Sequence, residues 1–373
     1  MAEQLGFDLT GEDVAGADIT GSRPVPPPDE EGRDRIRNDL DATLFVEAGA
    51  GAGKTSSLVD RIANLVDDGV DITGVAAITF TEKAAAELRT RVRGALTARA
   101  TEQASAALER LDHAPIGTLH AFARRVLFDF PIEAGLPPGF TVLDELESGL
   151  AFEEQWDDLL DGLLDDPEPA GGLVAGGRAF VELCEFDRFG VQTGVRRIAQ
   201  DFRANWDLVD DRVALDDPGP LRLDTDRALA LADEITAAVP PVGDKQEDTI
   251  GLAASFASQV RNATSLRVAL EAILAAHKFF SGRASMPGNK ANWKKHPGGE
   301  AALADLRAVE FEFGDEVQRL LDGVRRQRRL LVGAIIGRFV LDGARERAQS
   351  GRLEFHDLLV LARRLVATRR DIR

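Results

Sequence analysis

The sequence predicts an α/β fold in its N-terminal part, followed by a mainly helical second part. Between residues 30 and 129, short apolar runs that suit β-strands alternate with segments of helical composition, a pattern typical of a mostly parallel sheet with helices on both faces. A glycine-rich segment joins the first of these strands to the helix after it. From about residue 146 strand patterns become sparse, and we expect a mainly helical domain inserted in the α/β domain.

The individual elements are predicted from apolar periodicity and from the residues that start and stop helices. In the α/β part the expected order is helix 30–40, strand 43–46, helix 56–66, strand 75–80, helix 82–99, strand 115–118 and helix 121–129. In the second part helices are expected over 145–164, up to 203, and over 226–238, 250–276 and 300–349, with a loop over 165–178. Residues 1–28 are rich in Gly, Asp and Pro and are predicted to be a disordered leader.

The glycine-rich segment has the composition of a phosphate-binding P-loop. It stands between a strand and a helix and reads Ala48-Gly49-Ala50-Gly51-Ala52-Gly53-Lys54-Thr55. Glycines let successive backbone N–H groups turn toward phosphate oxygens, and the helix start adds its positive dipole end. Lys54 is expected to reach the β- and γ-phosphates of ATP, and the Thr55 hydroxyl to ligate Mg²⁺.

The predicted nucleotide-binding residues run from the start of this loop into the helix. They are Ala48, Gly49, Ala50, Gly51, Ala52, Gly53, Lys54, Thr55 and Ser56. Lys54 and Thr55 are also the predicted catalytic residues. Ala48 departs from the usual pattern, which begins with glycine. The alternative, a chance Gly/Ala-rich turn, does not explain a strand and a helix in register on either side.

The composition is that of a globular protein with no membrane partner. Of 373 residues, 44% are apolar and 29% charged, and no run approaches the roughly 18 apolar residues of a transmembrane helix. The one cysteine, Cys184, lies in an apolar stretch, so we expect a buried, inert thiol, a reducing compartment and a cytoplasmic location. The net charge of −18 by itself disfavours nucleic-acid binding, but local basic patches outrank net charge.

Two further segments stand at predicted strand-to-helix corners. Residues 78–91 read ITFTEKAAAELRTR, in which Thr81 is predicted to cap the following helix. Phe80, at the strand end, is either a core residue or an exposed platform on which a nucleic-acid base stacks. Residues 116–122 read IGTLHAF, and His120 is either a structural histidine or a nucleic-acid contact.

In this order and spacing, the three segments resemble motifs I and Ia and the TxHxF motif of superfamily 1 DNA helicases of the UvrD/RecB type. Members of that family typically show TFTxKAAxEMxxR after the P-loop, and residues 79–91 match this pattern closely. Residues 133–145 also resemble RecB/AddA-type members. The resemblance covers residues 30–150 and the end of the chain, and it implies a RecA-like P-loop NTPase domain.

The resemblance implies a DNA-dependent motor that couples ATP hydrolysis to stepping along single-stranded DNA, usually 3′ to 5′, in recombination or repair. The implied cofactors are ATP and Mg²⁺, and the implied partners are single-stranded and duplex DNA. Some relatives also carry a nuclease domain or bind a partner subunit. The residues that match DNA-contacting positions of the family are Thr79, Phe80, Thr81, Thr118 and His120.

The resemblance also implies a domain order. Residues 29–145 correspond to the first part of the ATP-binding domain 1A, which is RecA-like. Residues 146–330 correspond to a helical insertion similar to domain 1B, which in the family contacts duplex DNA. Residues 331–373 correspond to a return toward domain 1A that ends before motif II.

Two departures from the family pattern concern the chemistry. Many relatives place an adenine-reading glutamine about 20 residues before the P-loop lysine, whereas residues 30–35 read EEGRDR, which leaves nucleotide selectivity open. Motif II, the acidic strand end that holds Mg²⁺ and activates water, is not found. Residues 141–145, TVLDE, are either that site or a strand-to-helix junction with Asp144 and Glu145 at the helix start, and the residues after them favour the junction.

The end of the sequence suggests where motif II belongs. Residues 353–359, LEFHDLL, resemble the segment that lies shortly before motif II in the family. We therefore expect an N-terminal piece of a longer helicase, which binds nucleotide and hydrolyses it poorly or not at all by itself. The alternatives are another P-loop nucleotide hydrolase or kinase, for which residues 79–91 and 117–122 would be coincidence, and a non-catalytic nucleotide- or DNA-binding module.

Two basic stretches are weaker signals for DNA binding. Residues 288–296, GNKANWKKH, form either a phosphate contact in which Trp293 stacks on a base or a solvated loop around a packed Trp293. Residues 325–329, RRQRR, spread around a helix, which favours a solvated or acid-paired face. The histidines show no metal-ligand spacing.

Overall fold

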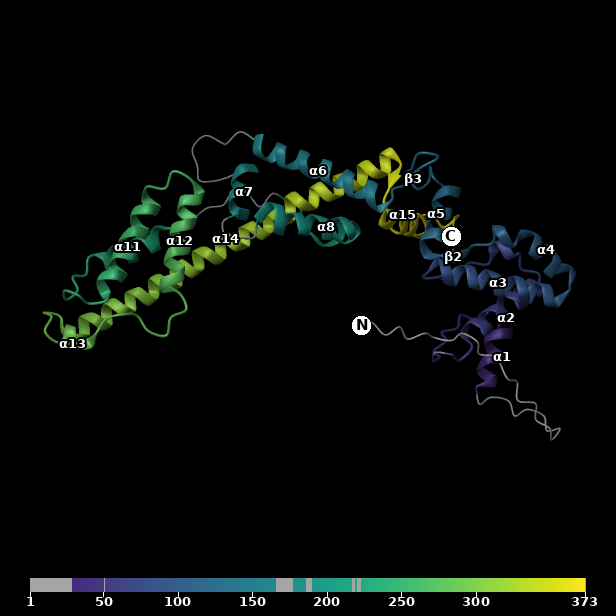
Figure 1. Cartoon of the computed structure of the whole chain (residues 1–373), viewed down its shortest axis with the longest axis horizontal. Helices are drawn as coiled ribbons and strands as arrows, with labels where there is room; N and C mark the ends of the chain where they lie inside the picture. Colours follow the sequence, from purple (N-terminus) through teal and green to yellow (C-terminus); the bar gives the residue numbers. More distant parts are fainter. Residues whose placement is uncertain are drawn as a thin grey trace, which may run out of the picture. The chain divides into compact units, whose positions relative to one another are not determined.

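The computed structural model describes residues 29–49, 51–165, 177–185, 190–216, 219 and 223–372, apart from the side chains of residues 178 and 179. The chain divides into two compact units, one that ends at Phe122 and one that begins at Ala123, and each has its own core (Figure 1). The predicted leader and most of the predicted loop after residue 165 lie outside the described residues.

The N-terminal unit alternates helices with two short strands. The strands are β1 (Ala77–Thr79) and β2 (Ile116–Thr118), which pair in parallel with Thr79 opposite Thr118. The helices are α1 (Glu30–Asn38), α2 (Lys54–Asp67), α3 (Glu82–Arg99), α4 (Glu102–Arg110) and the start of α5 (Leu119–Asp129), with 3₁₀ turns over Ile72–Gly74 and Leu111–His113.

Helix α3 forms over the full range that the sequence predicts. Thr81 has extended backbone, and its hydroxyl oxygen accepts the N–H of Ala84 at 3.2 Å, which confirms the predicted N-cap. Helix α4, which the sequence analysis did not predict, starts in the same way, because the Thr101 hydroxyl accepts the N–H of Ala104 at 3.1 Å. Both helices begin where a threonine satisfies a backbone donor that the helix leaves unpaired.

The core of this unit lies among α2, α3, α4 and the two strands. Helix α2 presents one apolar face to it, with buried side chains at the three- and four-residue spacing of a helix. The main core residues are Val59, Ile62, Ala63, Val66, Leu88, Val92, Leu96, Leu111 and Ile116. This packing fixes the start of α2 and the ends of both strands, where the predicted functional residues lie.

The sheet is smaller than the sequence analysis predicted. Instead of one parallel sheet with helices on both faces, the described residues hold two parallel pairs of strands, each strand two or three residues long. The predicted strand 43–46 pairs with no strand in the described part of the chain, and Phe45 is 94% exposed. A parallel strand needs hydrogen-bonding neighbours and helices over both faces, and the segment around Phe45 has neither.

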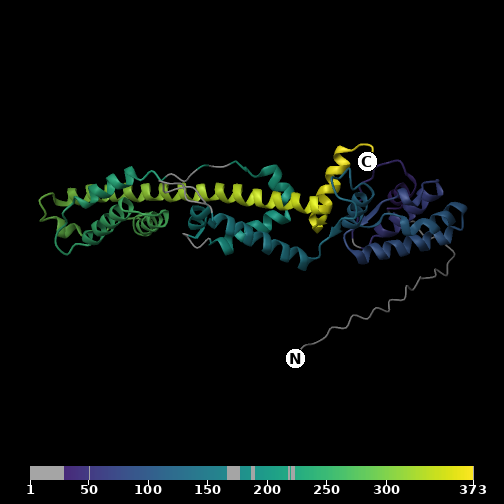
Figure 2. The ribbon, with the colours of Figure 1, turned by 90° about the horizontal axis from the view of Figure 1, so that it is seen from above.

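The second unit is built on one 52-residue helix, α14 (Gly299–Ser350). At 1.5 Å per residue this helix is about 78 Å long. Figures 1 and 2 show shorter helices beside it, α10–α12 along its first half and α7–α9 along its second half. The shorter helices are α6 (Glu145–Asp165), α7 (Gly177–Glu185), α8 (Arg196–Ala204), α9 (Trp206–Arg212), α10 (Asp226–Thr236), α11 (Gln246–Arg261), α12 (Leu266–Phe280), α13 (Lys290–Trp293) and α15 (Phe355–Thr368), with a π-helical turn over Gly190–Val195.

The helix predicted over 250–276 is two helices, α11 and α12. Asn262 ends α11, and the Ser265 hydroxyl accepts the N–H of Val268 at 3.4 Å to start α12. Asn, Thr and Ser side chains compete with the hydrogen bonds of a helix backbone, which explains why the chain breaks here. The break lets α12 pack against both α11 and α14.

Two separate cores lie along α14. The first half packs on α10–α12, with Leu303, Phe313, Val317 and Leu321 as its buried residues. The second half packs on α6–α9, with Val332, Ile336, Val340 and Leu341 as its buried residues. A small cluster of Leu183, Leu266, Leu270 and Val324 lies where the two cores adjoin. The middle of α14 therefore joins two packed blocks.

A buried ion cluster joins the end of α14 to α15. Arg347 donates to both carboxylate oxygens of Asp357, with Nε–Oδ2 at 2.8 Å and Nη2–Oδ1 at 3.0 Å. Trp206 Nε1 donates to Asp357 Oδ1 at 2.8 Å, and Asp357 is 1% exposed. Glu354 accepts from Arg203, and it forms a capping box with Asp357 that starts α15. Strands β3 (Thr141–Val142) and β4 (Arg352–Leu353) pair in parallel, and β4 comes just before this cluster in sequence.

Glu310 is fully buried in the first half of α14. Its Oε2 accepts from Gln246 Nε2 at 3.1 Å, whereas its Oε1 has no hydrogen-bond partner within the described structure. The nearby cation Arg307 donates to the carbonyls of Pro287 and Gly288. Burial therefore raises the pKa of Glu310 to about 7, although Gln246 and Arg307 oppose this rise.

We expect this buried carboxyl to make the helical unit less stable as the pH rises. Folded Glu310 keeps its proton up to about pH 7, but in the unfolded chain it loses the proton near its ordinary pKa of 4.5. The stabilisation is thus complete below pH 4.5 and is lost as the pH rises through 7, a change of about 3 kcal/mol.

Urea unfolding at pH 5 and pH 8 tests this prediction. Glu310→Gln should lose much less stability than the parent chain between the two values, and the exposed control Glu300→Gln should behave like the parent. The same pH dependence in Glu310→Gln and in the parent would contradict it.

Candidate nucleotide-binding site

The P-loop leads directly into α2, and its glycines adopt conformations that favour glycine. Gly51 and Gly53 have φ of +77° and +82°. Gly53 is the N-cap residue of α2, and among the described residues no side chain caps this end and no acidic residue stands in its first turn. The first N–H groups of α2 are therefore available to an anion. Ala50 lies outside the described residues.

The ammonium group of Lys54 folds back over the loop. Its Nζ donates to the carbonyls of Ala48 at 2.6 Å and Gly49 at 2.7 Å, and the side chain is exposed. Thr55 and Ser56 are exposed in the same first turn of α2. The cation and the Thr55 hydroxyl thus lie at the end of the helix whose N–H groups are open, as phosphate and Mg²⁺ binding requires.

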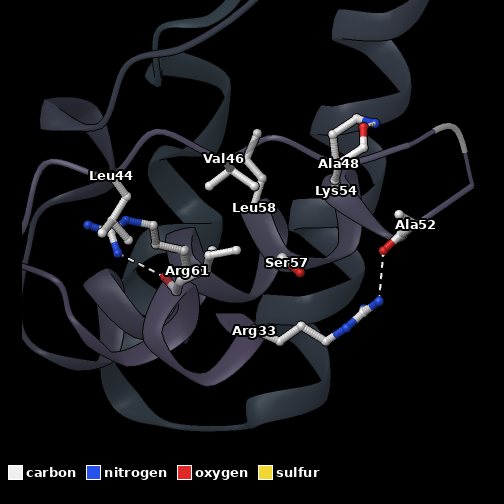
Figure 3. Close-up of a pocket in the computed structure, with 10 residues that line it drawn as sticks. Arg33, Leu44, Val46, Ala48, Ala52, Lys54, Ser57, Leu58 and Arg61 are labelled. Atoms are coloured by element: carbon white, nitrogen blue, oxygen red, sulfur yellow. Dashed lines mark hydrogen bonds between the residues drawn. The ribbon is translucent and has the colours of Figure 1, made fainter. Parts of the chain in front are cut away.

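A pocket of about 320 Å³ adjoins the P-loop (Figure 3). One part of its wall is the P-loop itself, and the rest is mostly apolar. The lining residues are Ala48, Ala52 and Lys54 from the loop, the apolar Ile36, Leu44, Val46 and Leu58, and the polar Arg33, Ser57 and Arg61. A nucleotide combines charged phosphates with a flat base, and this pocket offers a surface for each.

Two arginines that the sequence analysis did not single out hold this pocket together. Arg33 Nη2 donates to the carbonyl of Ala52 at 2.9 Å and pairs with Asp29 at 2.9 Å (Figure 3). Arg61 donates to the backbone carbonyls of Ile36, Asp39, Leu40 and Ala42 at 2.8–3.2 Å. Arg61 thereby ties the end of α1 and the segment before the P-loop to α2. Neither contact has a signal in local periodicity.

The two other predicted motifs meet at one edge of the β1–β2 pair. Because Thr79 lies opposite Thr118 in a parallel register, the residues after both strands stand at the same carboxyl edge. Phe80, the first residue after β1, is 102% exposed, so it is not a core residue. An exposed aromatic ring at a strand end has the form of a stacking platform for a base.

The polar residues at this edge are engaged in local hydrogen bonds. Buried Thr118 donates to Glu82 Oε1 at 3.0 Å, and Thr79 donates to the carbonyl of Thr81 at 3.1 Å. The Thr81 hydroxyl is the cap of α3, and His120 lies half-buried in the first turn of α5. Phe80 is thus the most exposed of the predicted DNA-contacting residues.

Comparison with protein families assigns this part of the chain. Residues 29–188 match the model of the UvrD/REP helicase N-terminal domain. These residues belong to the UvrD/REP helicase N-terminal family. The match includes the P-loop, the β1–β2 edge and α6, and it confirms the resemblance seen in the sequence motifs.

Two relatives of this UvrD/REP-type domain are both named as ATP-dependent helicase/nuclease subunits of the A type. The chain is 34% identical over 139 residues to the one from Pediococcus pentosaceus, covering 35% of this chain and 11% of the relative. It is 40% identical over 141 residues to the one from Moorella thermoacetica, covering 36% of this chain and 10% of the relative. The chain therefore spans about a tenth of the length of the curated relatives it matches.

Within the UvrD/REP-type domain, residues 141–145 form a strand-to-helix junction. Asp144 Oδ1 accepts the N–H of Glu147 at 2.8 Å, and Glu147 Oε2 accepts the N–H of Asp144 at 3.2 Å. These reciprocal bonds start α6, as a capping box does. The junction is the alternative that the sequence analysis favoured, and the carboxylate of Asp144 is occupied by the cap.

Beyond the UvrD/REP-type domain, the basic stretch 288–296 is a loop around a packed tryptophan. Trp293 is 2% exposed and belongs to the first core of α14, so it offers no stacking surface. Asp244 holds the loop by accepting the N–H of Asn289 at 3.1 Å and the amide of Asn292 at 3.0 Å. In the other basic stretch, Arg325 lies 3.7 Å from a carboxylate oxygen of its acidic neighbour Asp322.

Two findings concern the described residues as a whole. They contain no group of three or more His, Cys, Asp or Glu side chains placed to hold a metal ion. The helices among them are all too short or too polar to cross a bilayer. Cys184 is a buried free thiol, as predicted.

Proposed function

We propose that this chain is the ATP-binding part of a DNA helicase that couples ATP hydrolysis to 3′–5′ translocation and unwinding in recombination or repair. The observation that carries the proposal is the edge of the β1–β2 pair, where the fully exposed Phe80 follows a strand in the same unit as an open P-loop. The names of the relatives, which are ATP-dependent helicase/nuclease subunits, support it.

In this proposal the P-loop residues hold ATP and Mg²⁺. The N–H groups at the start of α2 would bind phosphate oxygens, Lys54 would exchange its two loop carbonyls for the phosphates, and the Thr55 hydroxyl would ligate Mg²⁺. Bound Mg²⁺ neutralises charge that develops on the phosphates during transfer. The pocket beside Leu44, Val46 and Leu58 would receive the base.

The remaining functional assignments rest on the same proposal. We assign residues 29–145 to domain 1A, residues 146–330 to an insertion of the 1B type and residues 331–373 to a return toward domain 1A. Single-stranded DNA would contact Thr79–Thr81, Thr118 and His120, and duplex DNA the insertion. A cytoplasmic location, and either a nuclease domain or a partner subunit, follow from a role like that of the named relatives.

One observation favours a second candidate, a non-catalytic nucleotide- and DNA-binding module. Hydrolysis needs a carboxylate to hold Mg²⁺ and activate water, and the nearest sequence candidate, Asp144, caps a helix instead. Both candidates require nucleotide and DNA binding, and they differ in turnover.

Replacement of Phe80 tests the DNA contact. Phe80→Ala should weaken binding of single-stranded DNA by about 1–3 kcal/mol, because a base loses its stacking partner, while the thermal stability stays unchanged because the ring is fully exposed. Fluorescence anisotropy of a labelled oligonucleotide measures the affinity. Phe45→Ala, which removes another exposed ring of the same unit, is the matched control and should leave the affinity unchanged. Equal DNA affinity in Phe80→Ala and the parent chain would refute the contact.

A further inference from the structure

Arg33 occupies a position from which it can select the base of a bound nucleotide. It lies in α1, lines the pocket beside the P-loop, and reaches the loop through the carbonyl of Ala52 at 2.9 Å. A Cβ placed on Gly53 would stand 3.0 Å from its Nη1, so the guanidinium lies directly against the loop. This inference rests on the proposed nucleotide binding and asks which base the pocket accepts.

The guanidinium is held in place by its neighbours. Nε donates to Asp29 Oδ2 at 3.0 Å and Nη2 donates to Ala52, while the side chain remains 25% exposed. The hydrogen bond with Asp29 raises the pKa of Arg33 above its ordinary value, so the group stays charged. A fixed guanidinium loses little side-chain entropy when it binds a ligand.

The other polar side chains of the pocket do not discriminate between bases. Arg61 already serves four backbone carbonyls, and these bonds hold the segment that forms the wall. Ser57 carries a hydroxyl, which both donates and accepts and so suits any base edge. The directional choice is therefore left to Arg33 among the side chains that line the pocket.

A guanidinium carries N–H donors and no acceptor. The N7/O6 edge of guanine presents two acceptors, which a guanidinium matches in a bidentate way, whereas the N7/N6 edge of adenine presents one acceptor and one donor. An amide side chain such as Gln matches adenine, because it offers one donor and one acceptor. An arginine at this place opposes the amino group of adenine and accommodates the oxygen of guanine.

We propose that Arg33 is the specificity-determining residue of this pocket and makes it accept guanine nucleotides at least as well as adenine nucleotides.

Competition binding on the full chain tests this inference. The dissociation constants of ATP and GTP are measured in the presence of Mg²⁺ by displacement of a fluorescent nucleotide. The parent chain should bind GTP as tightly as ATP or more tightly. Arg33→Gln should shift the ratio of the two constants toward ATP by about fivefold or more. Arg35→Gln, which changes an exposed arginine of the same helix outside the pocket, should leave the ratio unchanged.

The outcomes separate this inference from the proposed function. A parent chain that prefers ATP more than fivefold, or a folded Arg33→Gln with an unchanged ratio, would overturn the role of Arg33 while leaving nucleotide binding in place. Binding of neither nucleotide would overturn the proposed function and this inference with it. Because the ratio in the parent chain is a test by itself, a variant that fails to fold does not remove it. Arg33→Lys, which keeps the charge and the donors, should retain the absence of adenine preference.

Discussion

Lys54→Ala is expected to weaken nucleotide binding by roughly 100-fold or more, which corresponds to about 3 kcal/mol. The substitution removes the ammonium that would pair with the phosphates, whereas the N–H groups of α2 remain. The fold should not change, because Lys54 is exposed and its side chain contacts only the loop carbonyls of Ala48 and Gly49. Titration with a fluorescent nucleotide, with unfolding temperature as a check of the fold, measures both effects.

The matched control is Lys83→Ala, which removes an exposed lysine of α3 in the same unit and should bind nucleotide like the parent. Nucleotide affinity that is the same in Lys54→Ala and the parent would exclude the P-loop assignment. ATP turnover with and without single-stranded DNA is measured on the same proteins. Binding without turnover would favour the non-catalytic module, and DNA-stimulated turnover that Lys54→Ala abolishes would favour a motor that hydrolyses ATP by itself.

Asp357→Ala should destabilise the helical unit by about 3–5 kcal/mol. The change leaves the guanidinium of Arg347, which is 6% exposed, without the carboxylate that takes two of its hydrogen bonds. It also removes the acceptor of Trp206 Nε1 and half of the capping box that starts α15. Each of these losses leaves a buried polar group unpaired, which is the costly way to break a buried ion pair.

Chemical denaturation followed by circular dichroism measures this loss. Asp371→Ala is the control, because it removes an exposed carboxylate that pairs with Arg369 at 2.7 Å, and it should change the stability by less than about 1 kcal/mol. A loss of the same small size in Asp357→Ala would show that the buried cluster does not stabilise the unit.

Sequence reasoning succeeded where structure is decided locally. The range 82–99 was predicted in full, because Thr81 caps the helix and the residues after it are strong helix formers. The P-loop was recognised because the glycine conformations and the helix start are encoded within a few residues. The structure also confirms that Asp144 belongs to a helix start, which its spacing to Glu147 indicates.

Sequence reasoning failed where distant residues decide. The segment 43–46 has a strand-like composition, but a strand also needs neighbours, which composition does not reveal. Arg33 and Arg61 were overlooked because their partners are backbone carbonyls 19–25 residues away. The roles of Asp357 and Trp293 likewise depend on burial by other helices, as the contact between Trp206 and Asp357 illustrates.

The single helix α14 also sets which changes of length the second unit tolerates. Its two cores lie on either side of the stretch between Val324 and Val332, with no break in the helix between them. At 3.6 residues per turn, one inserted or deleted residue in this stretch would rotate one block against the other by about 100°. Insertions of about seven residues restore the rotation, but they move the blocks about 10 Å apart and separate Leu183 from Leu266 and Leu270. The distance between the two blocks is therefore fixed by the register of one helix.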